Sequence, residues 1–148
     1  MKDFISRSTQ NKLNKNGYVF ITLFVGNREK VFGEIHNGEM IINELGKIVE
    51  VEWQNIFENR NDLSIDEYII LPNRFYGIVQ VCESAGLFQS KIPRVIAEFK
   101  SRSSQLIHES GLEHFEWQKS FMEKKIKDEG ELNKIREYIF YSPMNMEE

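Results

Sequence analysis

The chain has 148 residues, of which 41% are hydrophobic and 28% charged, a composition typical of one globular domain with a buried core. Its single cysteine excludes an internal disulfide and any zinc site built from several cysteines. The sequence has neither an apolar run of roughly 18 residues nor an apolar N-terminal stretch, so we expect no membrane span and no export, with a cytoplasmic location as the default.

The net charge of −4 argues against broad, nonspecific affinity for nucleic acids. The charge is distributed unevenly along the chain. Residues 1–31 contain six basic and two acidic side chains, residues 32–90 contain three and ten, and residues 91–136 contain ten and eight. Positive charge therefore gathers in the first and third segments. These two segments either converge on one face or carry scattered, solvated side chains.

The N-terminal part of the chain predicts a polar arm followed by a strand. Residues 1–16 are rich in serine, asparagine and lysine, and we expect them to form a flexible arm. Residues 18–25 are rich in aromatic and β-branched side chains, which is the pattern of a buried strand. Residues 17–148 are expected to form a single domain.

A hairpin and a helix are predicted next. Residues 31–35 and 39–42 flank a His-Asn-Gly sequence, and Asn-Gly is a strong signal for a tight turn. Asn43 is suited to cap a helix, because the apolar residues that follow recur at spacings of three and four. This helix is predicted to end at about Asn59.

The second half of the chain predicts two strands and a further helix. Residues 64–71 and 75–82 are rich in apolar side chains and are separated by a Pro-Asn turn. Pro93 suits the first turn of a helix whose apolar stripe continues to Leu106. Residues 113–121 are aromatic but follow no regular period.

The last predicted element is a helix over residues 129–141, with Pro143 just past its end. The order of elements is strand, hairpin, helix, two strands, helix, helix. This order predicts an α+β fold, namely a ferredoxin-like antiparallel sheet packed with helices. Such a sheet can leave one face or edge open for a second copy, so we expect a homodimer.

Residues 71–78 carry the most specific motif of the chain. They read Leu-Pro-Asn-Arg-Phe-Tyr-Gly-Ile and resemble the active-site strand of the REP-associated tyrosine transposases, which are HUH single-strand nucleases. In that family the strand reads approximately Leu-Pro-Asn-His-Phe-His-Gly-Ile, and its two histidines hold a divalent metal. This chain has the same surrounding residues but has Arg74 and Tyr76 at the two histidine positions.

Further blocks resemble the same family in the same order. Residues 32–53 are similar to its first hairpin and helix, and residues 99–101 to its second helix. Residues 136–139, which read Arg-Glu-Tyr-Ile, resemble the helix that carries the catalytic tyrosine. The resemblance thus places Tyr138 at the nucleophile position, with Tyr141 as a weaker alternative.

The chemistry of the family explains why these positions matter. Cleavage of a phosphodiester by tyrosine needs a phenolate-like oxygen, whereas free tyrosine has a pKa of about 10. The family uses Mg²⁺ or Mn²⁺, which polarises the scissile phosphate and orients it for attack. Residues two apart on a strand share a face, so Arg74 and Tyr76 lie where two ligands would lie. The resemblance implies a third ligand one helical turn after the nucleophile, where this chain has Ser142.

These replacements lead us to expect no metal cofactor. Arginine has a permanent charge and no free lone pair, and protonated tyrosine binds Mg²⁺ or Mn²⁺ poorly. Two interpretations of Arg74 stay open: a fixed cation that clamps phosphate in place of the metal, or the remnant of a degenerate site. Metal-dependent cleavage is therefore expected to be lost, and whether the chain is an enzyme stays open.

Binding of DNA can survive the loss of cleavage, because the two use different residues. Basic side chains in the third segment can follow a phosphate backbone, and three aromatic side chains can stack on unpaired bases. The basic candidates are Arg94, Lys100, Arg102, Lys119, Lys124, Lys125 and Lys127, and the aromatic candidates are Phe115, Trp117 and Phe121. For Trp117 we favour packing of the last helix onto the sheet over base stacking.

The resemblance implies a transposase-family protein that recognises single-stranded or hairpin DNA as a homodimer. The alternative is a domesticated protein-interaction domain without any nucleic-acid role, which the acidic segment 32–90 favours slightly. A third hypothesis is an active nuclease that uses an unconventional site.

Overall fold

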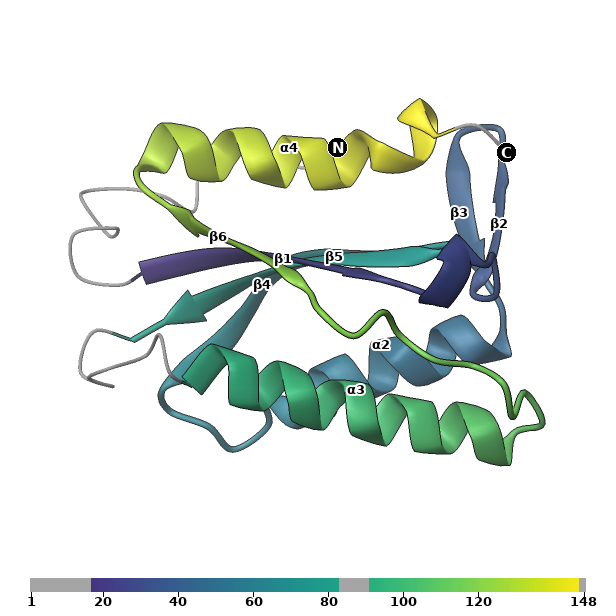
Figure 1. The fold of residues 1–148 in the computed structure, drawn as a ribbon. Helices are drawn as coiled ribbons and strands as arrows, with labels where there is room; N and C mark the ends of the chain where they lie inside the picture. The colour runs from purple at the N-terminus through teal and green to yellow at the C-terminus, as the bar shows by residue number, and fades with distance from the viewer. Residues whose placement is uncertain (1–16, 83–90, 147–148) are drawn as a thin grey trace.

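The computed structural model describes residues 17–82 and 91–146, which form one antiparallel sheet between two layers of helices (Figure 1). The strands of the sheet lie in the order β4-β5-β1-β6. Their bounds are β1 (Gly17–Phe24), β4 (Leu63–Leu71), β5 (Arg74–Val81) and β6 (Met122–Ile126).

Three helices cover the sheet. They are α2 (Glu44–Ile56), α3 (Lys91–Glu109) and α4 (Glu129–Asn145). Helices α2 and α3 pack on one face, and α4 lies alone on the other (Figure 1). The crossovers through α2 and α3 connect strands that are two positions apart in the sheet, which is the split β-α-β order of ferredoxin-like folds. The prediction of an antiparallel sheet packed with helices is confirmed.

A short hairpin stands beside the main sheet at the C-terminal end of α4 (Figure 1). It consists of β2 (Gly33–His36) and β3 (Glu39–Ile42), and it follows the 3-10 turn η1 (Gly26–Arg28). Asn37 and Gly38 adopt positive φ angles of 52° and 79°, as the two central residues of a type I′ turn require. The predicted Asn-Gly hairpin is confirmed.

The sheet separates two hydrophobic cores, because successive side chains along each strand point to opposite faces. On β1, Val19, Ile21 and Leu23 enter the larger core beneath α2 and α3. Tyr18 and Phe20 face α4 and belong to the smaller core on that side.

A β-bulge in β4 interrupts this alternation and decides which residues face α4. Ile65 pairs with Val79 and Tyr68 with Gly77, so two residues of β4 oppose the single residue between their partners on β5. Ile65 packs against the larger core, so Asp66 beside it faces α4, where it is buried in spite of its charge.

Strand β6 was not predicted from the sequence. Its five residues read Met-Glu-Lys-Lys-Ile, and only Ile126 is buried. The segment therefore lacks the apolar alternation that identifies an internal strand. Charged side chains, and lysine in particular, are common on edge strands because they discourage pairing with other chains.

The predicted end of the last helix at residue 141 is wrong, because α4 continues to Asn145 with Pro143 inside it. Proline lacks an N–H, so Pro143 leaves the carbonyl of Ile139 without its usual helical donor. The Ser142 hydroxyl donates to that carbonyl at 2.8 Å and replaces the missing bond. Helix α2 ends slightly earlier than predicted, at Ile56.

The predicted N-terminal arm over residues 1–16 lies outside the described residues. Within residues 17–82 and 91–146, none of the helices combines the length and the apolar composition that crossing a bilayer requires.

Candidate functional site

Three of the residues that the motif analysis singled out lie together on the α4 side of the sheet. Arg74 and Tyr76 project from β5, and Tyr138 projects from α4. The Nη1 of Arg74 donates to the Tyr76 hydroxyl at 3.1 Å. The Tyr76 and Tyr138 hydroxyls lie 3.3 Å apart, at hydrogen-bonding distance. The strand motif and the helix motif therefore contribute to one continuous polar cluster.

Aromatic rings surround the two phenols. The ring centroids of Tyr76 and Tyr138 are 5.5 Å apart, and Phe20 on β1 contacts both rings. Tyr76 is buried, with 5% of its surface exposed, whereas Tyr138 is 51% exposed. The cluster is therefore closed on the sheet side and reaches solvent at Tyr138.

Arg74 is fixed by neighbours at the end of the β1–β5 pair where Phe24 lies opposite it. Its Nε donates to Asn73 Oδ1 at 3.0 Å, and its guanidinium lies 5.1 Å from the ring centroid of Phe24. Arg28 lies over the same ring, at 3.9 Å. No pattern in the sequence pairs Arg28 with the motif, because the link is Phe24, which lies opposite Arg74 in the β1–β5 register and contacts both guanidinium groups.

The surroundings of Tyr138 hold its phenol in the protonated state. The hydrogen bond with Tyr76 raises the pKa of Tyr138 above its ordinary value, and desolvation raises it further. The charge of Arg74 lowers this pKa, but its effect is smaller. A nucleophilic tyrosine needs the opposite shift, because the phenolate is the attacking form.

We expect the pKa of Tyr138 to respond in opposite directions to two substitutions. Tyr76→Phe removes the largest cause of the upward shift, so the pKa of Tyr138 should fall. Arg74→Gln removes the favourable charge, so the pKa should rise. Both are measured by NMR titration of isotope-labelled tyrosine rings, with Tyr138→Phe to assign the signal and circular dichroism to verify folding at each pH. A shift of the same sign in both variants would contradict this description of the cluster.

The residues at the three expected ligand positions do not fit a divalent metal. Arg74 presents a cation, and Tyr76 presents a hydroxyl that is engaged with both Arg74 and Tyr138. Ser142 is buried, and its hydroxyl donates within its own helix. Mg²⁺ and Mn²⁺ prefer carboxylate, carbonyl and water oxygens, and imidazole is the other ligand expected in this family. In the described part of the chain, no three His, Cys, Asp or Glu side chains group closely enough to hold an ion.

A buried ion pair positions the helix that carries Tyr138. Arg136 Nε and Nη2 donate to the two carboxylate oxygens of Asp66 at 2.9 and 2.8 Å, and only 2% of each side chain is exposed. Burial alone would lower the pKa of Arg136, but the hydrogen bonds and charge of Asp66 outweigh it, and the net shift is upward. The guanidinium therefore remains charged and ties α4 to the bulge of β4. Sequence reasoning missed this pair.

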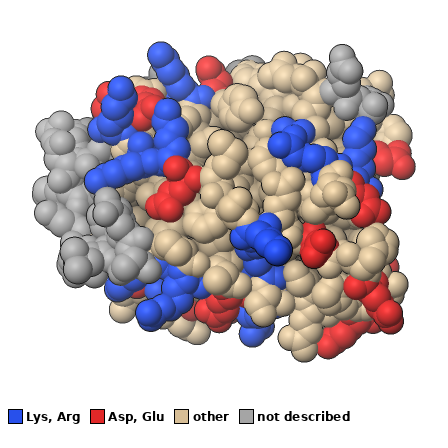
Figure 2. Space-filling model, in the orientation of Figure 1, with Lys and Arg blue, Asp and Glu red and all other residues tan. Residues whose placement is uncertain are grey.

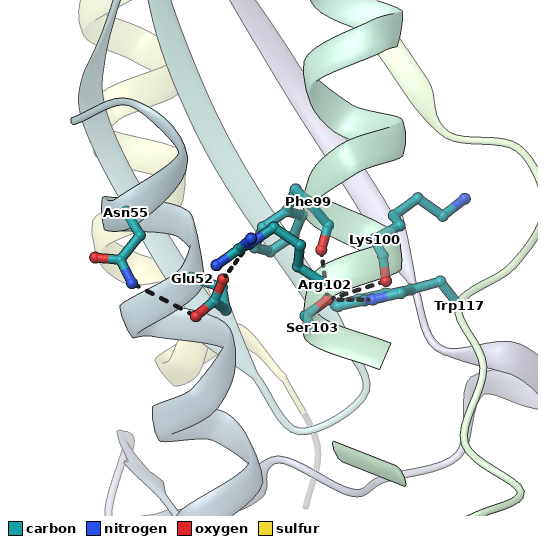
Figure 3. Close-up of polar contacts among 7 residues, drawn as sticks. All are labelled: Glu52, Asn55, Phe99, Lys100, Arg102, Ser103 and Trp117. Carbon is teal, nitrogen blue, oxygen red and sulfur yellow. Dashed lines mark hydrogen bonds and ion pairs between the residues drawn. The ribbon is translucent and has the colours of Figure 1, made fainter. Parts of the chain in front are cut away.

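Two of the basic residues predicted to bind DNA, Arg102 and Lys100 on α3, make structural contacts, and Figure 3 shows that of Arg102 with Glu52. Arg102 pairs with the buried carboxylate of Glu52 on α2 at 2.9 Å. The ammonium of Lys100 donates to the backbone carbonyls of Gln118 and Lys119, and desolvation lowers its pKa. These contacts hold α2, α3 and the following loop together.

The predicted basic residues lie on both faces of the sheet. Arg94, Lys100 and Arg102 belong to α3. Lys124 lies opposite Phe20 in the β1–β6 register and shares the α4 side, where it pairs with Glu131 at 3.0 Å. Lys125 lies opposite Val19 and faces the α3 side. Lys119 and Lys127 are exposed beside β6. Figure 2 shows lysine and arginine side chains spread over the visible face with acidic side chains between them.

Two of the three aromatic candidates for base stacking are buried. Trp117 is 5% exposed, and its Nε1 donates to Ser103 Oγ at 3.0 Å (Figure 3). Phe115 is 3% exposed and packs on Trp117. Trp117 is therefore a core residue, but the prediction that it packs the last helix onto the sheet is wrong, because it contacts Phe99 and Ser103 of α3 on the opposite face from α4. Phe115 belongs to the same core. Only Phe121, which is partly buried at the edge of the core, keeps some exposed surface.

Comparison with known proteins extends this description. No family model matches the sequence. A Haemophilus influenzae protein of uncharacterised function is 29% identical to this chain in an alignment of 149 positions. The alignment covers 89% of this chain and 83% of that protein.

Two solved structures share the fold. A REP-associated tyrosine transposase bound to a REP hairpin superposes with a TM-score of 0.62 and 19% identity, over 93% of this chain and 73% of that one. A candidate transposase from Deinococcus radiodurans R1 gives a TM-score of 0.55 and 14% identity, over 90% and 95% of the two chains. The structure therefore resembles the REP-associated tyrosine transposases in fold, as the sequence motifs predicted.

Proposed function

We propose that this protein binds single-stranded or hairpin DNA and does not cleave it by a metal-dependent route. One observation carries the proposal: Arg74, Tyr76 and Tyr138 form a hydrogen-bonded cluster at positions where the related fold would need two metal ligands and an activated nucleophile. The cluster offers cationic and hydroxyl donors to a phosphate but no ligand set for Mg²⁺ or Mn²⁺. No cofactor is part of the proposal.

The resemblance in fold to a transposase bound to a REP hairpin supports DNA as the ligand. Basic side chains of α3 and of the β6 edge and its flanks supply candidate phosphate contacts. Those proposed here are Arg94, Lys100, Arg102, Lys119, Lys124, Lys125 and Lys127. Because Lys100 and Arg102 are engaged within the fold, we expect the lysines of β6 and its flanks to contribute most.

Binding of a hairpin oligonucleotide is expected to weaken steeply as salt concentration rises, because phosphate contacts release counterions. Fluorescence anisotropy at several salt concentrations measures this dependence. Lys124→Gln should weaken binding and reduce the magnitude of the salt slope by about one. Lys47→Gln is a matched control, because Lys47 is similarly exposed and also pairs with one glutamate but lies on α2. Equal effects of the two substitutions would contradict a binding surface at β6.

Cleavage is tested on the same oligonucleotide with Mg²⁺ or Mn²⁺, using denaturing gels. We expect no product from the original chain or from Tyr138→Phe. Metal-stimulated scission that disappears in Tyr138→Phe would overturn the proposal in favour of an active nuclease.

The alternative function is a domesticated protein-interaction domain, which the acidic segment 32–90 favours. Absence of hairpin binding even at low salt would support it.

A homodimer is also part of the proposal, since β6 forms an edge of the sheet in the described chain and edge strands can pair with a second copy. Sedimentation velocity with and without DNA measures the oligomeric state.

A further inference from the structure

We propose that Arg74, Arg28 and the hydroxyl of Tyr138 form a direct binding site for one phosphate group of the DNA backbone, with no metal ion between protein and phosphate. The inference rests on the proposed function, because it names the chemical group that the same cluster recognises. It also assigns a role to Arg28, which lies 46 positions before Arg74 in the chain.

In the described chain, Arg74 and Arg28 form no ion pair with a carboxylate. Three other arginines each pair with a carboxylate at 2.8 or 2.9 Å: Arg60 with Asp62, Arg102 with Glu52, and Arg136 with Asp66. Within the residues that the structure describes, neither Arg74 nor Arg28 has such a partner, although Arg74 is half-buried. A partly desolvated cation without a counter-ion is unfavourable, so an anion that approaches it gains more than it would at a fully solvated side chain.

Arg74 also has N–H donors that no hydrogen bond uses in the described part of the fold. A guanidinium has five N–H groups, and Arg74 uses one on Asn73 and one on Tyr76. No bond to the Nη2 of Arg74 occurs in the described part of the protein. The Tyr138 hydroxyl meets Tyr76 on one side, and its ring is half-exposed to solvent. Free guanidinium donors beside an accessible hydroxyl are the groups that bind phosphate oxygens.

One buried side chain contacts both the guanidinium of Arg74 and the backbone of Arg28. Asn73 is 7% exposed; its Oδ1 accepts from Arg74 Nε at 3.0 Å, and its Nδ2 donates to the backbone carbonyl of Arg28 at 3.3 Å. The two guanidinium groups also contact the same Phe24 ring. The site is therefore largely organised before a ligand binds, which reduces the entropy lost on binding.

The chemistry of the proposed site is non-covalent. Tyr138 donates a hydrogen bond as a protonated phenol, which is consistent with its raised pKa, and no bond is broken. The phosphate is bound by charge and hydrogen bonds from the two guanidinium groups and the phenol. Tyr76 acts as a positioning residue, since its hydroxyl lies between Arg74 and Tyr138.

The experiment compares two probes, inorganic phosphate and the hairpin oligonucleotide. Phosphate is titrated into the isotope-labelled chain at low ionic strength, and NMR signals of the Arg74 Nε group and the Tyr138 ring are followed. Saturable shifts at both are expected. Arg74→Gln should weaken phosphate and hairpin binding about tenfold or more, and Arg74→Lys should weaken them less, because it keeps the charge but loses the planar donor pair. Arg28→Gln should also weaken both.

Arg94→Gln is the control for the phosphate probe, because Arg94 is an exposed arginine on α3, across the sheet from the cluster. For the hairpin, Arg74→Gln should also reduce the magnitude of the salt slope by about one. Thermal melting of each variant establishes that it is folded.

The outcomes separate the two proposals. Hairpin binding whose affinity and salt slope are unchanged in Arg74→Gln would overturn the phosphate site and leave the DNA-binding function standing. Phosphate binding that depends on Arg74, without any hairpin binding, would overturn the DNA-binding function and support a site for free phosphate or a phosphomonoester. Phosphate-induced NMR shifts that disappear in Arg94→Gln but persist in Arg74→Gln would overturn the site.

Discussion

Asp66→Asn is expected to lower the free energy of unfolding by about 3–5 kcal/mol, because it removes the carboxylate charge that is paired with the buried guanidinium of Arg136. Both side chains are only 2% exposed, and two hydrogen bonds of 2.8 and 2.9 Å join them. The substitution keeps the size of the side chain, so the loss reports on charge rather than on volume. Urea unfolding followed by circular dichroism measures it.

The double variant Asp66→Leu/Arg136→Met is the informative control. Replacing both partners of a buried ion pair by apolar side chains is often neutral or stabilising, because neither charge then has to be desolvated. We therefore expect this variant to unfold within about 1 kcal/mol of the original chain or above it. If the double variant were as unstable as Asp66→Asn, packing at this position, and not charge, would hold α4 on the sheet.

The ion pair also shows why part of the site escaped prediction. The motif over residues 71–78 and the tyrosine of α4 are local patterns, and they correctly indicated three side chains that meet in the fold. Arg136 lies at an inward-facing helix position, which a charged residue rarely occupies without a partner. Its partner Asp66 lies at the β4 bulge, where two successive residues oppose one residue of β5, and no residue pattern in that strand reveals a bulge.

The contrast between local sequence patterns and contacts with distant parts of the chain also explains the other differences between prediction and structure. Strands β1, β4 and β5 are buried and carry the apolar pattern of their environment, so their positions followed from the sequence. Strand β6 and the contact of Arg28 with the site depend on pairing partners far along the chain. Tertiary pairing of this kind overrides local preference, and a single sequence does not encode it visibly.

The site also depends on the core beneath the opposite face of the sheet. Phe75 lies between Arg74 and Tyr76 on β5, and its side chain points away from both into the larger core. There its ring centroid lies 4.6 Å from that of Trp53 on α2. Rigid packing around Phe75 therefore fixes the strand backbone from which the two site residues project.

Trp53→Ala is accordingly expected to lower the free energy of unfolding by about 3–5 kcal/mol. It should also disturb the cluster of Arg74, Tyr76 and Tyr138 on the α4 side of the sheet. Trp53 is fully buried and packs on Phe57, Phe75 and Phe99 at centroid distances of 4.8, 4.6 and 5.1 Å. Within the described chain its Nε1 has no hydrogen-bond partner. Trp53→Phe removes that unsatisfied donor while keeping an aromatic ring, so it should lower the free energy of unfolding clearly less than Trp53→Ala does. Urea unfolding and the NMR signals of the tyrosine rings measure both effects, and equal losses in the two variants would contradict this role of the aromatic cluster.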